Sequence, residues 1–157
     1  MPLSFSARHA DARTLDAGVL AVLCVKGTSA PDALASLDAL LGGAIARSFS
    51  RGAFIGKRDE VLHLVGGETG PQRILLIGMG DVTDRTAALK RAAQLAGRRA
   101  NGLETASLAV MVPSGLDTTG IEQVVVGTSM GAWEYRELKS APTDVRILLE
   151  SITVLVD

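Results

Sequence analysis

The chain has 157 residues, of which 47% are hydrophobic and only 3% are aromatic, and 16 basic residues against 17 acidic ones give a formal net charge of −1. This length fits one domain whose core is built from Ala, Val, Leu and Ile. Near-neutrality excludes a general electrostatic attraction to nucleic acid or to an anionic membrane, although it leaves room for a local charged patch.

Cys24 is the single cysteine, which excludes an intrachain disulfide and is typical of a reducing compartment. The first nine residues lack the basic region and long apolar run of a signal peptide. No apolar stretch approaches the roughly 18 residues of a membrane span. We therefore expect a cytoplasmic protein that has no membrane partner.

Two strands are predicted at the start of the chain. Residues 3–7 alternate apolar and polar side chains, which predicts a half-buried strand at the edge of a sheet. Residues 19–25 are continuously apolar, which is the pattern of a central strand covered on both faces.

A capped helix is predicted from Ser29 to about Leu41. Ser29 lies three residues before Asp32, a spacing typical of the side chains that cap a helix start, and Pro31 suits the first turn. A glycine pair then ends the helix, and a second short helix is predicted over residues 44–49.

A hairpin is predicted after these helices. Residues 52–58 form a polar, glycine-punctuated loop that leads into a strand over residues 61–65. Turn residues fill positions 66–71, and a further strand over residues 73–77 closes the hairpin.

The second half of the chain alternates helices and strands. A helix opened by Thr83 or Asp84 runs to about residue 102, a buried strand covers residues 107–112, and a last helix opened by Thr118 or Thr119 contains Trp133. The glycines at positions 127 and 131 of that last helix indicate close packing. One or both of the segments 145–149 and 152–156 are expected to be strands.

Strands separated by helical segments imply crossover connections between parallel strands. The predicted fold class is therefore α/β, with three layers: a mixed, mostly parallel sheet and helices on both of its faces.

A phosphate site is weakly indicated by Gly78-Met79-Gly80-Asp81, because glycines let backbone amides approach an anion at a helix start. The third glycine of a dinucleotide motif is absent, and no Gly-Lys-Ser or Gly-Lys-Thr follows. The sequence favours a plain strand-to-helix turn over a nucleotide site.

No catalytic, cofactor-binding or metal-binding residue is predicted. His9 and His63 are far apart in the sequence, and Cys24 lies inside an apolar run where a thiol ionises poorly. The serines show no nucleophile elbow. The acidic pairs Asp59-Glu60 and Glu134/Glu137 are typical of solvated loops and helix surfaces.

The predicted helix after residue 84 carries basic side chains with no acidic ones between them: Arg85, Lys90, Arg91, Arg98 and Arg99. Such a face could contact phosphates or the acidic surface of a partner. A solvated face is the more common role and the whole chain is nearly neutral, so nucleic acid is the less favoured partner.

Four segments resemble, in order and spacing, the amino-terminal domain of the leucine (cytosol) aminopeptidase family: Gly-Gly-Ala-Ile-Ala-Arg at 42–47, Gly-Ala-Phe-Ile-Gly-Lys at 52–57, the strand at 74–77 and Gly-Ala-Trp-Glu-Tyr-Arg at 131–136. The resemblance implies a macro-domain-like fold. It also implies an amino-terminal domain over residues 1–140, with residues 141–157 forming a connector and last strand towards a catalytic domain missing from this chain.

The same resemblance implies that catalysis belongs to that other domain, where two divalent cations, manganese or zinc, serve an exopeptidase acting on peptides. The family's metal motif, similar to Asn-Thr-Asp-Ala-Glu-Gly-Arg, does not occur in the chain, so no residue inherits a catalytic role. The implied partners are the catalytic domain of the same polypeptide and, in the full-length protein, further copies in a hexamer.

Three functions remain open from the sequence. The first is a non-catalytic domain that serves assembly, substrate access or regulation of a leucyl aminopeptidase. The second is a free-standing macro-like module that binds an ADP-ribose-type ligand at the carboxyl ends of its strands, with residues 78–81 and 127–131 as candidate loops. The third is nucleic-acid binding through the basic helix.

Overall fold

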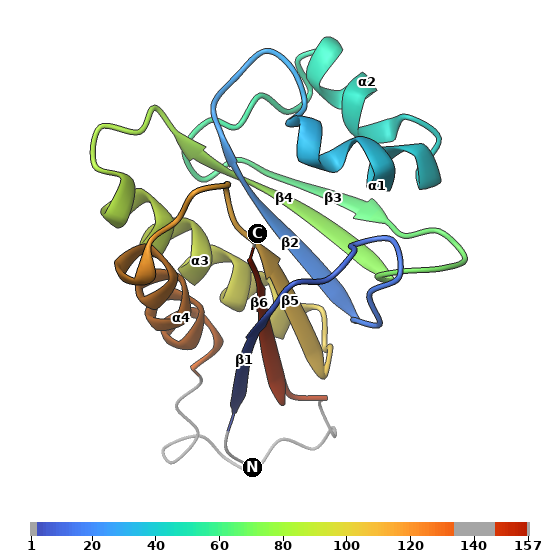
Figure 1. Cartoon of the computed structure of the whole chain (residues 1–157). Helices are drawn as coiled ribbons and strands as arrows, with labels where there is room; N and C mark the ends of the chain where they lie inside the picture. Colours follow the sequence, from blue (N-terminus) through green and yellow to red (C-terminus); the bar gives the residue numbers. More distant parts are fainter. Residues whose placement is uncertain (1–2, 134–146, 157) are drawn as a thin grey trace.

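The computed structural model describes residues 3–133 and 147–156. In this part of the chain the strands form one sheet in the order β1-β6-β5-β2-β4-β3 (Figure 1). The strands are β1 (Ser4–Arg8), β2 (Val19–Val25), β3 (Val61–Val65), β4 (Arg73–Gly80), β5 (Ser107–Met111) and β6 (Ser151–Leu155). The β3–β4 pair is antiparallel and the other pairs are parallel.

Helices cover both faces of this sheet (Figure 1). One face carries α3 (Arg85–Gly102) and α4 (Thr118–Ala132), and the other carries the short helices η1 (Asp32–Leu34), α1 (Ala35–Leu40) and α2 (Ala44–Ser50). The predicted α/β class, with a mixed and mostly parallel sheet, is confirmed.

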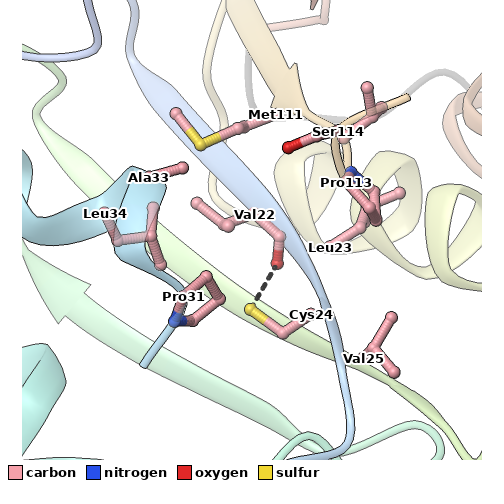
Figure 2. Close-up of a pocket in the computed structure, with 11 residues that line it drawn as sticks. Val22, Leu23, Cys24, Val25, Pro31, Ala33, Leu34, Met111, Pro113 and Ser114 are labelled. Carbon is pink, nitrogen blue, oxygen red and sulfur yellow. Dashed lines mark hydrogen bonds between the residues drawn. The ribbon is translucent and has the colours of Figure 1, made fainter. Parts of the chain in front are cut away.

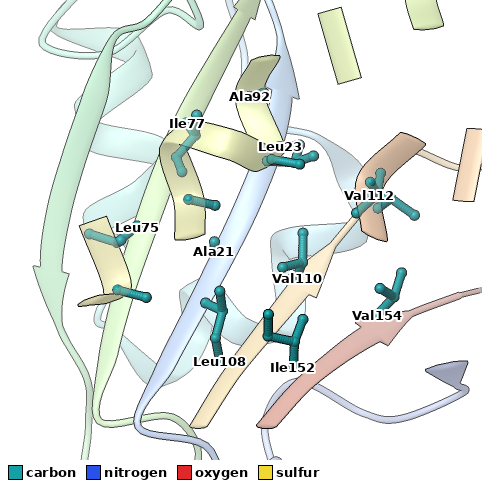
Figure 3. Packing of buried hydrophobic residues seen from close by; sticks show 14 of the residues in the cluster. Ala21, Leu23, Leu75, Ile77, Ala92, Leu108, Val110, Val112, Ile152 and Val154 are labelled. Carbon is teal, nitrogen blue, oxygen red and sulfur yellow. The ribbon is translucent and has the colours of Figure 1, made fainter. Parts of the chain in front are cut away.

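The core is divided by β2, as its apolar sequence predicts. Val19 and Ala21 point into the cluster beneath α3 and α4, whereas Leu20 and Val22 point into the cluster beneath α1 and α2. Val19, Leu20 and Ala21 are completely buried, because each face of a parallel sheet needs an apolar cover. Figure 3 shows part of the first cluster, with side chains of β2, β4, β5 and β6 and, near Leu23 and Ile77, Ala92 of α3.

The predicted hairpin is confirmed by the antiparallel pairing of β3 with β4. β4 continues three residues beyond the predicted end, to Gly80, because its last part still pairs with β2.

The first predicted strand forms at an edge of the sheet, but it is not half-buried. All five residues of β1 are exposed, and Phe5 retains 41% of its accessible surface. The helix nearest this edge, α4, packs against the neighbouring strand β6. Alternation of residue types therefore indicated the strand correctly and its burial wrongly.

The capped helix predicted from Ser29 is also wrong in detail. Pro31 occupies the cap position, no side chain caps the helix, and the first turn is the 3₁₀ helix η1. The acidic side chain that does cap a helix here is Asp38, whose carboxylate accepts hydrogen bonds from the backbone N–H of Ile45 (2.7 Å) and Ala46 (3.1 Å) at the start of α2.

The two long helices are capped by aspartates. Asp84 accepts a hydrogen bond from Ala87 N–H at the start of α3 (3.1 Å), as one of the two predicted caps. Asp117 does the same for Gly120 N–H at the start of α4 (2.8 Å), one residue before the predicted threonines. These bonds satisfy N–H groups that have no partner inside the helix.

The predicted close packing of α4 is confirmed by its glycines. A methyl group on Gly127 would lie 2.3 Å from the carbonyl oxygen of Lys90, and one on Gly131 would lie 1.9 Å from that of Gln94. Gly97 of α3 approaches Thr128 of α4 in the same way. The backbones of α3 and α4 can therefore touch only because these positions lack side chains.

The last described strand lies inside the sheet. β6 matches the predicted segment 152–156 with a shift of one residue towards the N-terminus. Residues 147–150 form no strand, and 145–146 fall outside the described part. β6 pairs with β1 on one side and β5 on the other. The division into 1–140 and 141–157 stays a prediction.

Candidate functional site

A cavity of about 260 Å³ opens at the carboxyl ends of β2 and β5 (Figure 2). The chain leaves β2 towards η1 and the β4 side of the sheet, whereas β5 lies on the opposite side of β2. The connection after β2 therefore leads to one half of the sheet, while β5 belongs to the other half. Open α/β sheets commonly bind ligands at such a point, where the strand order changes direction. The cavity is lined by residues 22–25 of β2, by Pro31, Ala33 and Leu34 of the η1 region, and by residues 111–114 at and beyond the end of β5.

The lining of this cavity is mainly apolar. Burial raises the pKa of the Cys24 thiol to about 12, and its Sγ donates to the carbonyl oxygen of Val22 at 3.6 Å. Cys24 is a core residue, as predicted, and its neutral thiol is a poor nucleophile. Ser114 adds a hydroxyl at the rim. The lining therefore suits a small, mainly apolar group with few polar contacts.

The glycines of residues 78–81 serve packing. Gly78 and Gly80 are buried inside β4, and a methyl group on Gly78 would lie 1.9 Å from the carbonyl oxygen of Lys57. Gly80 N–H donates to Gly56 at 2.9 Å. The backbone of the 52–60 loop therefore packs against these glycines, which supports the favoured sequence interpretation that residues 78–81 are not a nucleotide site.

The second candidate ligand loop of the macro-like hypothesis, residues 127–131, is not a loop. These residues form the interior of α4, and their glycines are filled by the backbone of α3. In both segments glycine lets another group approach the backbone closely, but that group is the backbone of a neighbouring segment of the protein and not a ligand.

The histidines and the cysteine are placed apart. His9 is exposed after β1, His63 is exposed on β3 with its Nε2 3.3 Å from Arg73 Nη1, and Cys24 is buried in β2. Among residues 3–133 and 147–156, no group of three or more His, Cys, Asp or Glu side chains could hold a metal ion.

The acidic pair Asp59-Glu60 holds the loop before β3. Glu60 Oε2 accepts hydrogen bonds from the backbone N–H of Ile55 (3.1 Å) and Lys57 (2.9 Å). Asp59 lies 3.4 Å from Arg91 Nε and adopts a left-handed backbone conformation, with φ of 61°. The pair Glu134/Glu137 lies outside the described residues.

The basic helix contributes to a groove that the sequence did not indicate. Two adjoining hollows, of about 230 and 360 Å³, lie along α3 beside β3, and Arg98 and Arg99 line both. Val61 and His63 of β3 line the first hollow, and Asp59 and Arg91 the second. Arg85 points elsewhere, donating to the Ser114 carbonyl at 3.1 Å. The groove depends on strand order, which spacing along the chain does not reveal.

In the part of the chain that the structure describes, no helix combines the length and apolar character that crossing a membrane requires.

Comparison with known proteins gives matches over most of the chain. The sequence model of the cytosol aminopeptidase family, N-terminal domain, matches residues 20–142. A probable cytosol aminopeptidase of Syntrophotalea carbinolica is 32% identical over 130 residues, which cover 78% of this chain and 26% of that protein. The chain thus spans about a quarter of the length of this curated relative.

Two solved structures share the fold. A mutant of tomato leucine aminopeptidase superposes with a TM-score of 0.81 at 22% identity, covering 98% of this chain and 32% of that one. The macrodomain of Mycobacterium tuberculosis DarG superposes with a TM-score of 0.62 at 16% identity, covering 98% of this chain and 99% of that one. The macro-domain-like architecture is therefore shared beyond the aminopeptidases.

Proposed function

The chain belongs to the cytosol aminopeptidase family, in which it corresponds to the N-terminal domain, and we propose from this that it acts as a non-catalytic domain of a leucyl aminopeptidase. The observation that carries the proposal is the continuous family match over residues 20–142. In this proposal the parent is a cytoplasmic two-metal exopeptidase that releases amino-terminal residues from peptides. Its cations, manganese or zinc, are held by another domain of the polypeptide.

The use of carboxylates in the chain supports this division of labour. Two-metal hydrolysis needs several oxygen ligands within a few ångströms of one another. Here Asp38, Asp84 and Asp117 are occupied in capping helices, and Glu60 is occupied in holding the loop before β3. These side chains stabilise the fold instead of converging on a common point.

The role we propose is in assembly of a hexamer, access of peptides to the catalytic domain, or regulation. A chimera tests whether the domain contributes to the oligomeric size and activity of the parent enzyme or can be removed without effect. In the Syntrophotalea carbinolica relative, the matching region is replaced by residues 1–157 or deleted. We expect the chimera to keep oligomeric size and activity that the deletion loses; equal behaviour of both would refute the proposal.

The purified chain tests where the chemistry lies. With leucine p-nitroanilide and added manganese, we expect no turnover above the buffer rate. Turnover that a chelator abolishes would show a hydrolytic centre within these residues and would overturn the proposal.

A second candidate function is binding of an ADP-ribose-type ligand. It is favoured by the position of the cavity at the carboxyl ends of β2 and β5, though not by its mainly apolar lining, and by the superposition of 98% of the chain on a macrodomain. Titration calorimetry with ADP-ribose tests it, with Ala33→Trp as the variant that fills the cavity. Binding to the original chain but not to the variant would support this function; absence of both heat and a thermal shift would remove it.

A further inference from the structure

β3 is an open edge of the sheet. Among residues 3–133 and 147–156, β3 is hydrogen-bonded to β4 alone, on one side. In an antiparallel pair of strands, hydrogen-bonded and non-hydrogen-bonded residue pairs alternate. The bonds from Gly78 N–H to the Glu60 carbonyl (2.8 Å) and from Gly66 N–H to the Gln72 carbonyl (2.7 Å) show which pairs are the bonded ones here. By that alternation Leu62 and Leu64 bond to β4, and the backbone groups of the other three residues point away from the sheet.

In the part of the chain that the structure describes, this edge lacks the usual protection. Edge strands are normally blunted by lysine, proline, bulges or a covering segment. The sequence of β3 is Val-Leu-His-Leu-Val, its pairing is regular, and Val65 keeps 77% of its surface exposed. No backbone bond among residues 3–133 and 147–156 uses the outward groups of Val61, His63 or Val65. The edge can therefore accept a further strand.

The edge lies beside concentrated positive charge. Val61 and His63 face the side of the sheet that α3 covers and line a hollow with Arg98 and Arg99. Both arginines are exposed, and neither forms an ion pair within the described part of the chain. Residues 85–102 contain no acidic side chain, and the single acid of the groove, Asp59, is held between Arg58 and Arg91.

We propose that the β3 edge and the α3 arginines together bind an extended, acidic peptide segment of a partner protein, added to the sheet as a strand. Backbone hydrogen bonds to β3 would supply affinity, and alternate side chains, about 7 Å apart, would project over the face that carries α3. Acidic residues at those alternate positions meet the unpaired charges of Arg98 and Arg99. This inference goes beyond the proposed aminopeptidase role and does not depend on it.

Charge and the outward backbone groups of β3 together favour this partner over a second copy of the chain and over nucleic acid. Antiparallel pairing of β3 with a second copy, across a two-fold axis perpendicular to the sheet, would place the arginines of both copies on the same face of one continuous sheet, where they repel. Nucleic acid would satisfy the arginines but has no use for the outward backbone groups of an edge strand. An acidic strand uses both features.

Fluorescence anisotropy with a labelled peptide, Thr-Glu-Val-Glu-Val-Glu-Thr, tests the proposal on the 157-residue chain. We expect binding that weakens as salt rises from about 50 to about 300 mM, because the charges are exposed. The double variant Arg98→Glu, Arg99→Glu should weaken binding by about tenfold or more, since like charges then face each other. Arg8→Glu, on the opposite edge of the sheet, is the matched control and should change affinity by less than about twofold.

Two changes test strand addition itself. His63→Pro removes an outward N–H without touching the ladder to β4, and proline is tolerated at such edge positions. A peptide N-methylated at alternate residues removes the partner's donors and leaves the protein unaltered. We expect each to weaken binding by about fivefold or more.

Three results would overturn the proposal. The first is no binding of the peptide at low salt. The second is binding indifferent to both N-methylation and His63→Pro, with duplex DNA preferred, which would assign the arginines to nucleic acid. The third is a dimer of the free chain that His63→Pro dissociates, which would assign the edge to a second copy.

Discussion

At Gly78 the loop before β3 approaches β4 so closely that no side chain fits. The obstacles to a methyl group are all backbone atoms, of Lys57 and Gly56, at 1.9 to 2.8 Å. Backbone cannot rotate away as a flexible side chain can, so relief would require the loop to move as a unit. That loop also carries Asp59, which anchors Arg91 of the basic groove.

Gly78→Ala is therefore expected to destabilise the protein by about 3 kcal/mol, at the upper end of the cost of overpacking. Urea unfolding followed by circular dichroism measures this. Gly102→Ala is the control, because a methyl group there has nothing within 4 Å. A loss at Gly78 no larger than at Gly102 would mean that the loop is free to shift.

Cys24 provides a second residue-scale prediction. Because burial raises the pKa of its thiol to about 12, only about one molecule in ten thousand carries the thiolate at pH 8. We expect Ellman's reagent to label the native chain slowly and the urea-unfolded chain within minutes. Equal rates in both conditions would place the thiol at the surface.

The same raised pKa predicts an alkaline effect on stability. The folded state favours the neutral thiol, so its contribution is fully present below the unfolded pKa near 8.5 and is lost as pH rises towards 12. Cys24→Ala should therefore show a smaller fall in unfolding free energy between pH 8 and pH 10.5 than the original chain. A parallel fall in both would contradict this coupling.

Glycine shows why a sequence indicates some features and hides others. Glycine at positions 78, 127 and 131 indicates that some group approaches the backbone closely. Whether the approaching group is a ligand or another segment depends on tertiary structure. In each case it is a carbonyl oxygen of the protein: of Lys57 at Gly78, and of α3 at the other two.

At the scale of elements, the sequence predicts well those helices and strands that depend on residues close together in the chain. The apolar run of β2 and the turn-linked strands β3 and β4 follow from composition over a few residues. The sequence does not indicate the cap of α2, because its donor groups lie across a glycine turn, seven and eight residues from Asp38. It does not indicate the basic groove either, because β3 and α3 are brought together only by the sheet.

The caps of the long helices give an element-scale prediction. Asp84→Ala removes the acceptor for Ala87 N–H at the start of α3, and should cost about 1 kcal/mol. Asp84→Asn retains an acceptor and should cost less than half as much. Chemical denaturation of the three proteins measures the difference. Equal losses for both variants would mean that charge, and not the cap bond, is what Asp84 contributes.

At the scale of the molecule, the last strand of the chain, β6, is inserted between two earlier strands of the sheet. β6 lies between β1 and β5, so residues near the two ends of the chain pair with each other, as Ser6 and Thr153 do through their hydroxyls at 3.1 Å. Strand order of this kind has no local signature, which is why the sequence predicted a strand here but not its position. The family match itself stops at residue 142, before β6.

Deletion of residues 147–157 is expected to abolish cooperative folding. It removes Ile152, Val154 and Leu155 from the core, each worth about 1.5–3 kcal/mol of apolar burial, and together these approach the 5–15 kcal/mol stability of a typical domain. It also separates β1 from the sheet. Deletion of residues 1–8 is the matched control, because β1 is an exposed edge and its loss leaves β6 paired with β5. Thermal melting and dye binding to exposed apolar surface distinguish the two: a cooperative transition in the first variant would show that the boundary predicted at residue 140 is the true end of the folding unit.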